Sequence, residues 1–121
     1  MSERFFSNKH IWIQMNGDMA VLGISDYAQD KLGSIMFLNL PDKGERLLCG
    51  QRFGDIESVK TVSDLISPVD GEVVKVNEDL VDETELINDK PYESWFVEVR
   101  MDARPDDLMD EETYLKRKEE L

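Results

Sequence analysis

The chain has 121 residues, a length typical of a single domain with one hydrophobic core. Acidic residues outnumber basic ones by 27 to 14, and the formal net charge of −13 argues against partners with phosphate backbones or anionic lipid surfaces. No apolar run approaches the roughly 20 residues of a membrane-spanning helix, and the N-terminal residues lack the apolar run of a signal peptide. We therefore expect one cytoplasmic domain over residues 1–121, with no nucleic acid and no membrane as a partner.

Two strands joined by a tight turn are predicted first. Apolar residues alternate along residues 10–15, which indicates a strand. Asn16 and Gly17 are typical of a hairpin turn, because both accept a positive φ at low cost. Residues 19–24 are then the returning strand.

A short helix and further strands follow. Ser25 can cap a helix of about two turns, and Gly33 can end it. Residues 34–40 predict a buried strand, and a short strand is expected around residues 47–48. A Pro/Asp/Gly turn separates these two strands.

The middle of the chain predicts another hairpin. Strands are expected over about residues 53–58 and from about Val62 onward. A turn at residues 67–71 leads into a strand over residues 72–77.

The C-terminal part predicts an acidic loop over residues 78–91 with one short helical turn, and a last strand over residues 93–101. A C-terminal helix is expected over residues 105–119, where acidic residues lead and basic ones trail, as the helix dipole favours. Many short strands with turns between them and little helix favour a mostly β fold, a small sandwich or barrel.

Few side chains suit metal binding or catalysis. Cys49 is the only cysteine, which excludes an internal disulfide and a cysteine-based zinc site, and His10 is the only histidine. We expect Cys49 to be a small buried residue and His10 to be structural. No Gly-rich phosphate loop is present. The sequence therefore predicts no metal site and no self-sufficient catalytic site.

Lys60 occupies an unusual place in this acidic chain. It lies at the tip of the predicted middle hairpin, between Val59 and Thr61, which are poor turn residues. A lysine in a turn is usually a solvated residue. A rigid tip also suits a carrier lysine, whose amine can become an amide and hold a long arm. Carriers of lipoamide or biotin move an intermediate between separate enzymes, so they need no catalytic groups of their own.

Several segments, in order, resemble the H-protein family of the glycine cleavage system, which are lipoyl carriers. Together they span most of the chain: GISDYAQDKLGSIMFLNLPDKG (23–44), ESVKTVSDLISPVDGEVVKVN (57–77), ELINDKPY (85–92) with Trp95 after it, and LMDEETY (108–114). The second segment resembles the lipoylation segment of the family, and Lys60 stands in the place of the modified lysine.

The resemblance implies a flattened barrel-sandwich hybrid with a short internal helix and a C-terminal helix, and a lipoyl hairpin around residues 53–67. It implies a lipoyl amide on Lys60, and recognition of Glu57 and Gly71 by a lipoate ligase or a lipoyl/octanoyl transferase. The arm in this family accepts an aminomethyl group from the pyridoxal-phosphate-dependent glycine decarboxylase and delivers it to the aminomethyltransferase. Dihydrolipoyl dehydrogenase then reoxidises the arm. The chain is then a non-catalytic carrier.

Three positions bear on the cleft that holds the loaded arm in this family. The family usually has His-Glu-Trp where this chain has Ile11 between His10 and Trp12, and the glutamate helps to hold the arm. Lys31 stands where some members have histidine, whereas the aspartate four residues after the modified lysine is kept as Asp64. We therefore expect Asp64, Ile11 and Lys31 in the arm cleft, beside an intact attachment site.

The altered cleft leaves one main alternative, an H-protein-like lipoyl carrier of another pathway. A sulfur-oxidising heterodisulfide-reductase-like system and a lipoyl relay are examples. A biotinyl carrier is disfavoured, because that family prefers Met on both sides of the lysine. The last alternative is a β-barrel interaction module or small enzyme unrelated to lipoate, which an unmodified Lys60 in cells with active lipoylation would favour.

Overall fold

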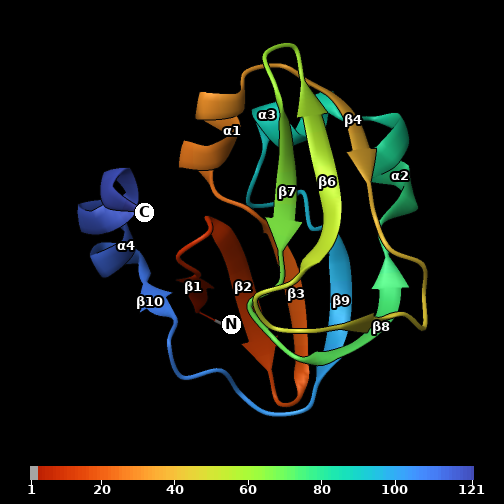
Figure 1. Cartoon of the computed structure of the whole chain (residues 1–121), viewed down its shortest axis with the longest axis vertical. Coiled ribbons are helices and arrows are strands. Elements are labelled where there is room, and N and C mark those ends of the chain that lie inside the picture. Colours follow the sequence, from red (N-terminus) through yellow and green to blue (C-terminus); the bar gives the residue numbers. More distant parts are fainter. Residues whose placement is uncertain (1–2) are drawn as a thin grey trace.

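The computed structural model describes residues 3–121 and contains two antiparallel sheets that share one core. The larger sheet has the strand order β10-β1-β2-β3-β9-β8-β5 and the smaller one the order β4-β6-β7 (Figure 1). The predicted mostly β fold is therefore confirmed. The strands are β1 (Arg4–Phe6), β2 (Ile11–Asn16), β3 (Met19–Ile24), β4 (Ile35–Asn39), β5 (Arg46–Leu47), β6 (Arg52–Ser58), β7 (Val62–Ile66), β8 (Gly71–Val76), β9 (Val97–Met101) and β10 (Met109–Asp110).

Short helices pack against the two sheets. They are α1 (Asp26–Leu32), α2 (Glu78–Asp82), α3 (Glu85–Asp89) and α4 (Glu111–Arg117), followed by a 3-10 turn at Lys118–Glu120. Among the described residues, no helix has the length and apolar character needed to cross a membrane.

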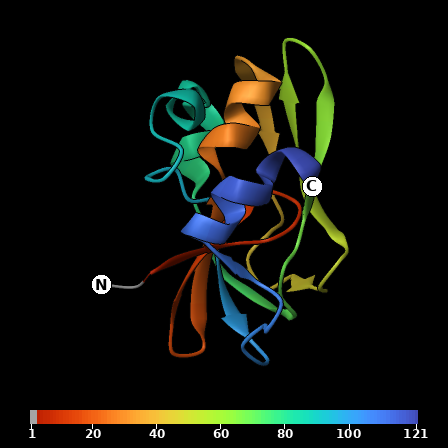
Figure 2. The same ribbon diagram turned by 90° about the vertical axis from the view of Figure 1, so that its left-hand side faces the viewer.

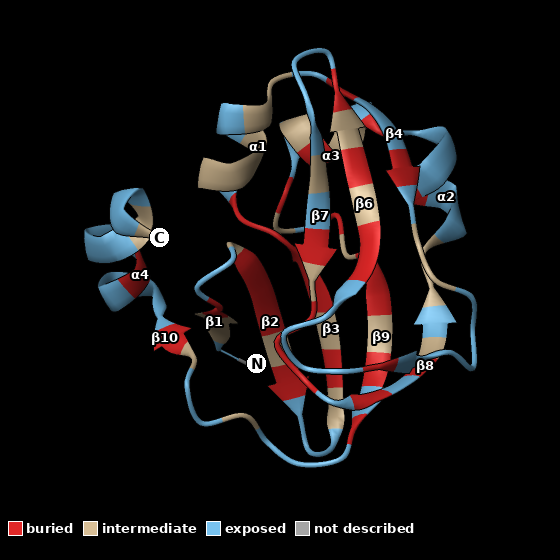
Figure 3. Ribbon diagram, viewed as in Figure 1, coloured by how far each residue is buried: buried red, intermediate tan, exposed pale blue. Residues whose placement is uncertain are grey.

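Strand β2 is buried on both faces, as Figure 3 shows. Ile11 and Ile13 enter the main core between the sheets, whereas Trp12 packs on the opposite face with Phe6 and Tyr114. The Trp12 indole lies flat against Gly23 of the paired strand, where a Cβ would lie 2.5 Å from the ring. This second cluster packs α4 against the N-terminal strands. Figure 2 shows α4 in front of these strands.

The C-terminal helix is shorter than predicted. It begins at Glu111, because the Asp110 carboxylate accepts the N–H of Thr113 at 2.8 Å and caps the helix there. Residues 109–110 instead pair with Phe5 and Phe6 of β1. The expected start at residue 105 was wrong, since the strand pairing of Met109 depends on a partner about a hundred residues away.

Other boundaries also differ from the prediction. The acidic loop over residues 78–91 holds two short helices, α2 and α3, and the last strand begins at Val97 rather than at residue 93. Strand β1 was not predicted. Cys49 is exposed, not buried, because it lies in the turn after β5, where its backbone N–H donates to Asp70 at 2.7 Å.

A hydrogen-bonded chain of three buried or half-buried side chains joins α1 to α4. The Ser25 hydroxyl accepts the N–H of Ala28 at 3.1 Å, as the predicted cap requires, and lies 2.6 Å from the Tyr114 hydroxyl. That hydroxyl also lies 2.6 Å from His10 Nδ1. Burial raises the pKa of Tyr114 to about 12, so its hydroxyl stays protonated near neutral pH. These hydrogen bonds hold the start of α1 against the N-terminal end of β2.

We predict that Ser25→Ala lowers the free energy of unfolding by about 1–3 kcal/mol, because the change removes both the cap and a buried hydrogen bond. Urea denaturation measures the effect. Asp30→Ala, at an exposed position of the same helix, is the control and should change stability by less than about 0.5 kcal/mol. Equal stabilities of wild type and Ser25→Ala would contradict the role of this cap.

Candidate functional site

Lys60 lies at the tip of the β6–β7 hairpin, where the structure makes it an exposed residue. Ser58 shapes the tip: its N–H donates to the Thr61 carbonyl at 2.8 Å, and its hydroxyl accepts the N–H groups of Lys60 and Thr61 at 3.1 and 3.2 Å. The backbone N–H of Val59 donates to Ser34 at 3.0 Å. These hydrogen bonds stabilise the turn, which in common turns is the role of Asn or Gly. The β-branched Val59 and Thr61 are therefore tolerated at the tip.

Ser58 was missed from the sequence. A signal was present, because a serine two residues before the lysine can accept backbone N–H groups in a turn. Its hydroxyl is fixed by three contacts with the tip, the third being a donated hydrogen bond to Thr61 O at 3.3 Å. These hydrogen bonds therefore hold the backbone of the tip in one conformation and leave the lysine exposed.

The stem of Lys60 passes close to Gly33, the residue that ends α1. A Cβ at Gly33 would lie 3.3 Å from Lys60 Cε, and the glycine has a φ of +79° that L residues rarely adopt. Gly33 thus serves both the helix end and the close approach of the lysine. Within residues 3–121, no hydrogen bond or ion pair engages the Lys60 ammonium group, which leaves it available for reaction.

A cleft of about 210 Å³ lies between α1 and the β6–β7 hairpin. Ile56, Ser63 and Leu65 line it from the hairpin, and Ile11 lies among its apolar lining residues. The remaining lining residues are Lys9, His10, Ile24, Tyr27, Ala28, Lys31 and Leu32. None of these residues is acidic. The cleft offers an apolar body with lysines beside it.

The charged residues that line the cleft, Lys9 and Lys31, are positive, although the chain as a whole is strongly acidic. Lys31 Nζ lies 5.4 Å from the centre of the Tyr27 ring, and Lys118 Nζ lies 5.2 Å from the same ring. His10, held with a φ of +67°, hydrogen-bonds with Tyr114, and burial lowers the pKa of His10. The imidazole is therefore neutral near pH 7, and Lys31 and Lys118 are the cations beside Tyr27.

The three residues expected in the arm cleft do not all lie in the cleft between α1 and the β6–β7 hairpin. Ile11 and Lys31 line the cleft, but Asp64 does not. Side chains alternate along β7, so its neighbours Ser63 and Leu65 take the cleft side while Asp64 lies on the other face, where its carboxylate is 3.2 Å from Arg52 Nε. Asp64 therefore lies outside the lining of this cleft, and its part in holding an arm stays a prediction.

Glu57 and Gly71, the two residues expected in lipoylation recognition, differ in how far they are buried. Glu57 is half-buried on β6, directly opposite Phe37 and Val62, and can be reached by a docked protein. Gly71 is buried in β8, where a Cβ would lie 2.4 Å from the carbonyl oxygen of Arg100. The Cβ position of Gly71 faces neighbouring backbone and not solvent, and recognition of Gly71 by a modifying enzyme stays a prediction.

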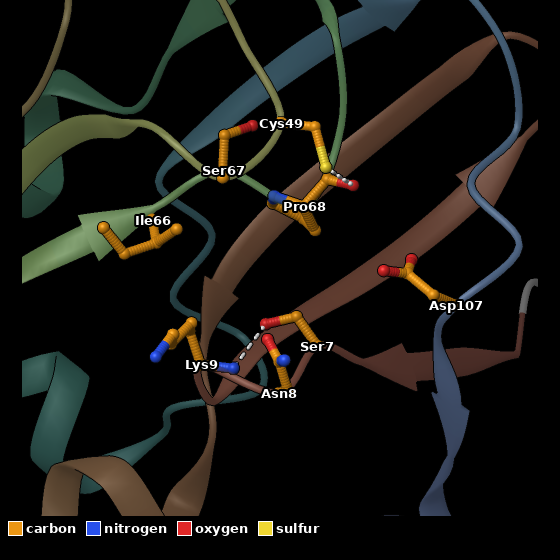
Figure 4. Close-up of a pocket in the computed structure, with 9 residues that line it drawn as sticks. Ser7, Asn8, Lys9, Cys49, Ile66, Ser67, Pro68 and Asp107 are labelled. Carbon is orange, nitrogen blue, oxygen red and sulfur yellow. Dashed lines mark hydrogen bonds between the residues drawn. The ribbon is translucent and has the colours of Figure 1, made fainter. Parts of the chain in front are cut away.

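A second pocket of about 270 Å³ lies where β7 ends, beside Cys49 (Figure 4). The Cys49 thiol donates to the Pro68 carbonyl at 3.5 Å. Although the residue is exposed, partial burial of its thiol raises the pKa of Cys49, and the nearby carboxylates of Asp107 and Asp70 raise it further. The thiolate that nucleophilic chemistry needs is thereby disfavoured.

Known proteins agree with this arrangement. The family model for the glycine cleavage H-protein matches residues 4–121. Curated proteins named glycine cleavage system H protein include one from Rubrobacter xylanophilus, 46% identical over 95% of this chain and 91% of its own length. Another, from Vibrio parahaemolyticus, is 47% identical over 95% of this chain and 94% of its own length.

A solved structure matches as well. The crystal structure of a glycine cleavage system H protein from Mycobacterium marinum superposes with a TM-score of 0.90 and 33% sequence identity, covering 98% of each chain. This match confirms the expected barrel-sandwich hybrid. The fold, the hairpin that presents Lys60 and these similarities together establish that the chain belongs to the glycine cleavage H-protein family.

Proposed function

We propose that this protein is the lipoyl carrier of the glycine cleavage system and that Lys60 is the attachment residue. The observation that carries the proposal is an exposed, unpaired lysine on a rigid hairpin tip, next to an apolar cleft. Its partners are glycine decarboxylase, aminomethyltransferase, dihydrolipoyl dehydrogenase and the lipoylating enzyme. The protein itself acts as a non-catalytic carrier, and the cytoplasm is its expected location.

Attachment is an acyl transfer to the lysine. Lys60 Nζ, once deprotonated, attacks the carbonyl carbon of an activated lipoyl donor, either an acyl adenylate or a carrier thioester. The new C–N bond replaces the C–O or C–S bond of the donor, and the amine loses a proton. The product is a neutral amide on a long stem, so the positive charge of the tip disappears.

The cleft residues fit the far end of such an arm. A lipoyl group supplies a dithiolane that carries the aminomethyl group between enzymes. Ile11, Ile56 and Leu65 line the cleft but are almost fully buried, so the partly exposed Tyr27, Ala28 and Leu32 of α1 would give the arm most of its apolar contact. Lys31 lines the cleft from the α1 side. These contacts shelter the arm from water without any catalytic group.

We predict that Lys60→Arg abolishes lipoylation, because the guanidinium is not a nucleophile near neutral pH. Intact mass with peptide mapping, after expression in lipoate-replete cells, should show one lipoyl amide on the wild type and none on the variant. Lys75→Arg, on exposed β8 surface, is the matched control and should be modified like the wild type. An unmodified wild-type Lys60 would overturn the proposed function.

We predict that Gly71→Ala lowers the free energy of unfolding by about 1–3 kcal/mol, since the added Cβ meets the Arg100 backbone. The folded variant should be lipoylated with the kcat/KM of the wild type. Glu72→Ala, at the adjacent exposed position, controls for strand β8. A stable Gly71→Ala protein that is lipoylated slowly would instead support Gly71 as a recognition residue.

We predict that Lys31→Glu slows the loss of the aminomethyl group from the loaded arm by about two- to fivefold, because an exposed carboxylate pairs weakly with the protonated amine. Loss is measured as the formaldehyde released when water hydrolyses the carbon–sulfur bond to give formaldehyde, ammonia and the thiol. Lys31→Gln separates the new carboxylate from removal of the lysine charge. Wild-type rates for both variants would place the amine outside this cleft.

A carrier role in another pathway is favoured by one observation, the cleft without an acidic lining residue. Such a cleft offers a protonated amine no ion pair. The two functions are separated by loading: the lipoylated protein, incubated with glycine, pyridoxal phosphate and glycine decarboxylase, should gain the aminomethyl group. Failure to load a fully lipoylated protein would favour the other pathway.

A further inference from the structure

A row of exposed apolar side chains crosses the small sheet beside Lys60. Phe37 is 56% exposed, Val59 62% and Val62 60%. Strand register places Phe37 directly opposite Glu57, and Glu57 directly opposite Val62. Paired residues share one face of a sheet, so Phe37, Glu57 and Val62 form one row, and Val59 extends it to the tip. We call Phe37, Val59 and Val62 the tip patch.

The next row away from the tip is polar. Asp55 is opposite both Asn39 and Asp64 in the strand register. The Asn39 amide donates to Asp55 at 2.7 Å, and Arg52 forms ion pairs with Asp55 and Asp64. The outer face of the hairpin therefore carries apolar side chains next to the lysine, on both sides of the half-buried Glu57, and a net acidic border. Protein interfaces have this organisation, an apolar core with a polar rim.

The inner face of the same hairpin has a different task. Ile56 and Leu65 are buried on it and line the cleft. Glu57 and Val62 lie on the opposite face, because side chains alternate along β6 and β7, and Phe37 pairs with Glu57 on that face, while Val59 is exposed in the turn. A protein bound to the tip patch would leave the cleft free. The hairpin thus separates the surface that shelters an arm from a surface that faces outward.

We infer that the tip patch is the docking surface for the enzyme that acylates Lys60, an inference that rests on the proposed function. That enzyme must bring a carbonyl carbon within about 3–3.5 Å of Nζ, so its surface must touch the tip itself. Enzymes that act on the far end of the finished arm work an arm length away and have no such need. The acidic border and the net charge of −13 select a partner with a basic rim around an apolar centre.

The double variant Phe37→Thr/Val62→Thr tests the inference, because it removes apolar surface and keeps residues that suit a strand. The unmodified protein is incubated with lipoate, ATP, Mg²⁺ and a lipoate–protein ligase, and lipoylation is followed by intact mass. We expect kcat/KM to fall about tenfold or more, as for the loss of central interface residues. Urea denaturation of the variant should match the wild type, since both positions are exposed.

Two matched variants report on apolar surface elsewhere. Val81 of α2 is 42% exposed and Leu115 of α4 is 53% exposed, and Val81→Thr and Leu115→Thr should be lipoylated like the wild type. The double variant, driven to full lipoylation by long incubation, should be loaded by glycine decarboxylase at the wild-type rate. This combination assigns the tip patch to the acylating enzyme.

Other outcomes overturn the inference. Unchanged lipoylation of the double variant would remove the docking role. Normal lipoylation with impaired loading would assign the patch to the decarboxylase, and a wild-type dimer that the double variant loses would assign it to a second copy of the chain. A wild type that the ligase cannot modify at all contradicts the proposed function instead, which distinguishes the two failures.

Discussion

The two-residue alternation of side chains along β6 and β7 is the constraint on which the site depends. It sends Ile56 and Leu65 inward to the cleft and leaves Glu57 and Val62 on the outer face. A shift of one residue in the register would exchange these faces and remove the cleft wall. The two functions proposed for the hairpin, sheltering an arm and receiving an acylating enzyme, therefore follow from one geometric rule.

Rigidity at the tip comes from local bonds, whereas the cleft opposite depends on contacts between distant segments. Ser58 organises the turn around Lys60 with its own backbone and hydroxyl. The α1 wall is instead held by Ser25 and Tyr114, which are 89 positions apart. His10 joins this chain at the cleft itself. The C-terminal helix thereby supports the position of the cleft, although α4 contributes no residue to its lining.

Much of the fold could be predicted because its signals are short. The Asn16-Gly17 turn, the Ser25 cap and the Gly33 helix end each depend on residues within one turn of the chain. The C-terminal helix was predicted too long because its acidic leading segment suits a helix, whereas Asp110 caps it and Met109 pairs with β1. The strand β1 has three residues, too few for a periodic pattern.

The sequence by itself determined the place of Lys60, a lysine between two strands in a segment that resembles a lipoylation motif, because turn chemistry and motif spacing are local properties. Tertiary structure alone decided which of the expected residues meet. In the folded chain Ile11 and Lys31 line the cleft, whereas Asp64 lies on the outer face of the hairpin. Gly71 is buried against the backbone of Arg100. Tertiary structure also aligned Phe37 with Val62 across Glu57. The physical reason is that strand pairing and the packing of α1 against the strands bring together residues that are far apart in the sequence. Local sequence patterns cannot predict such contacts.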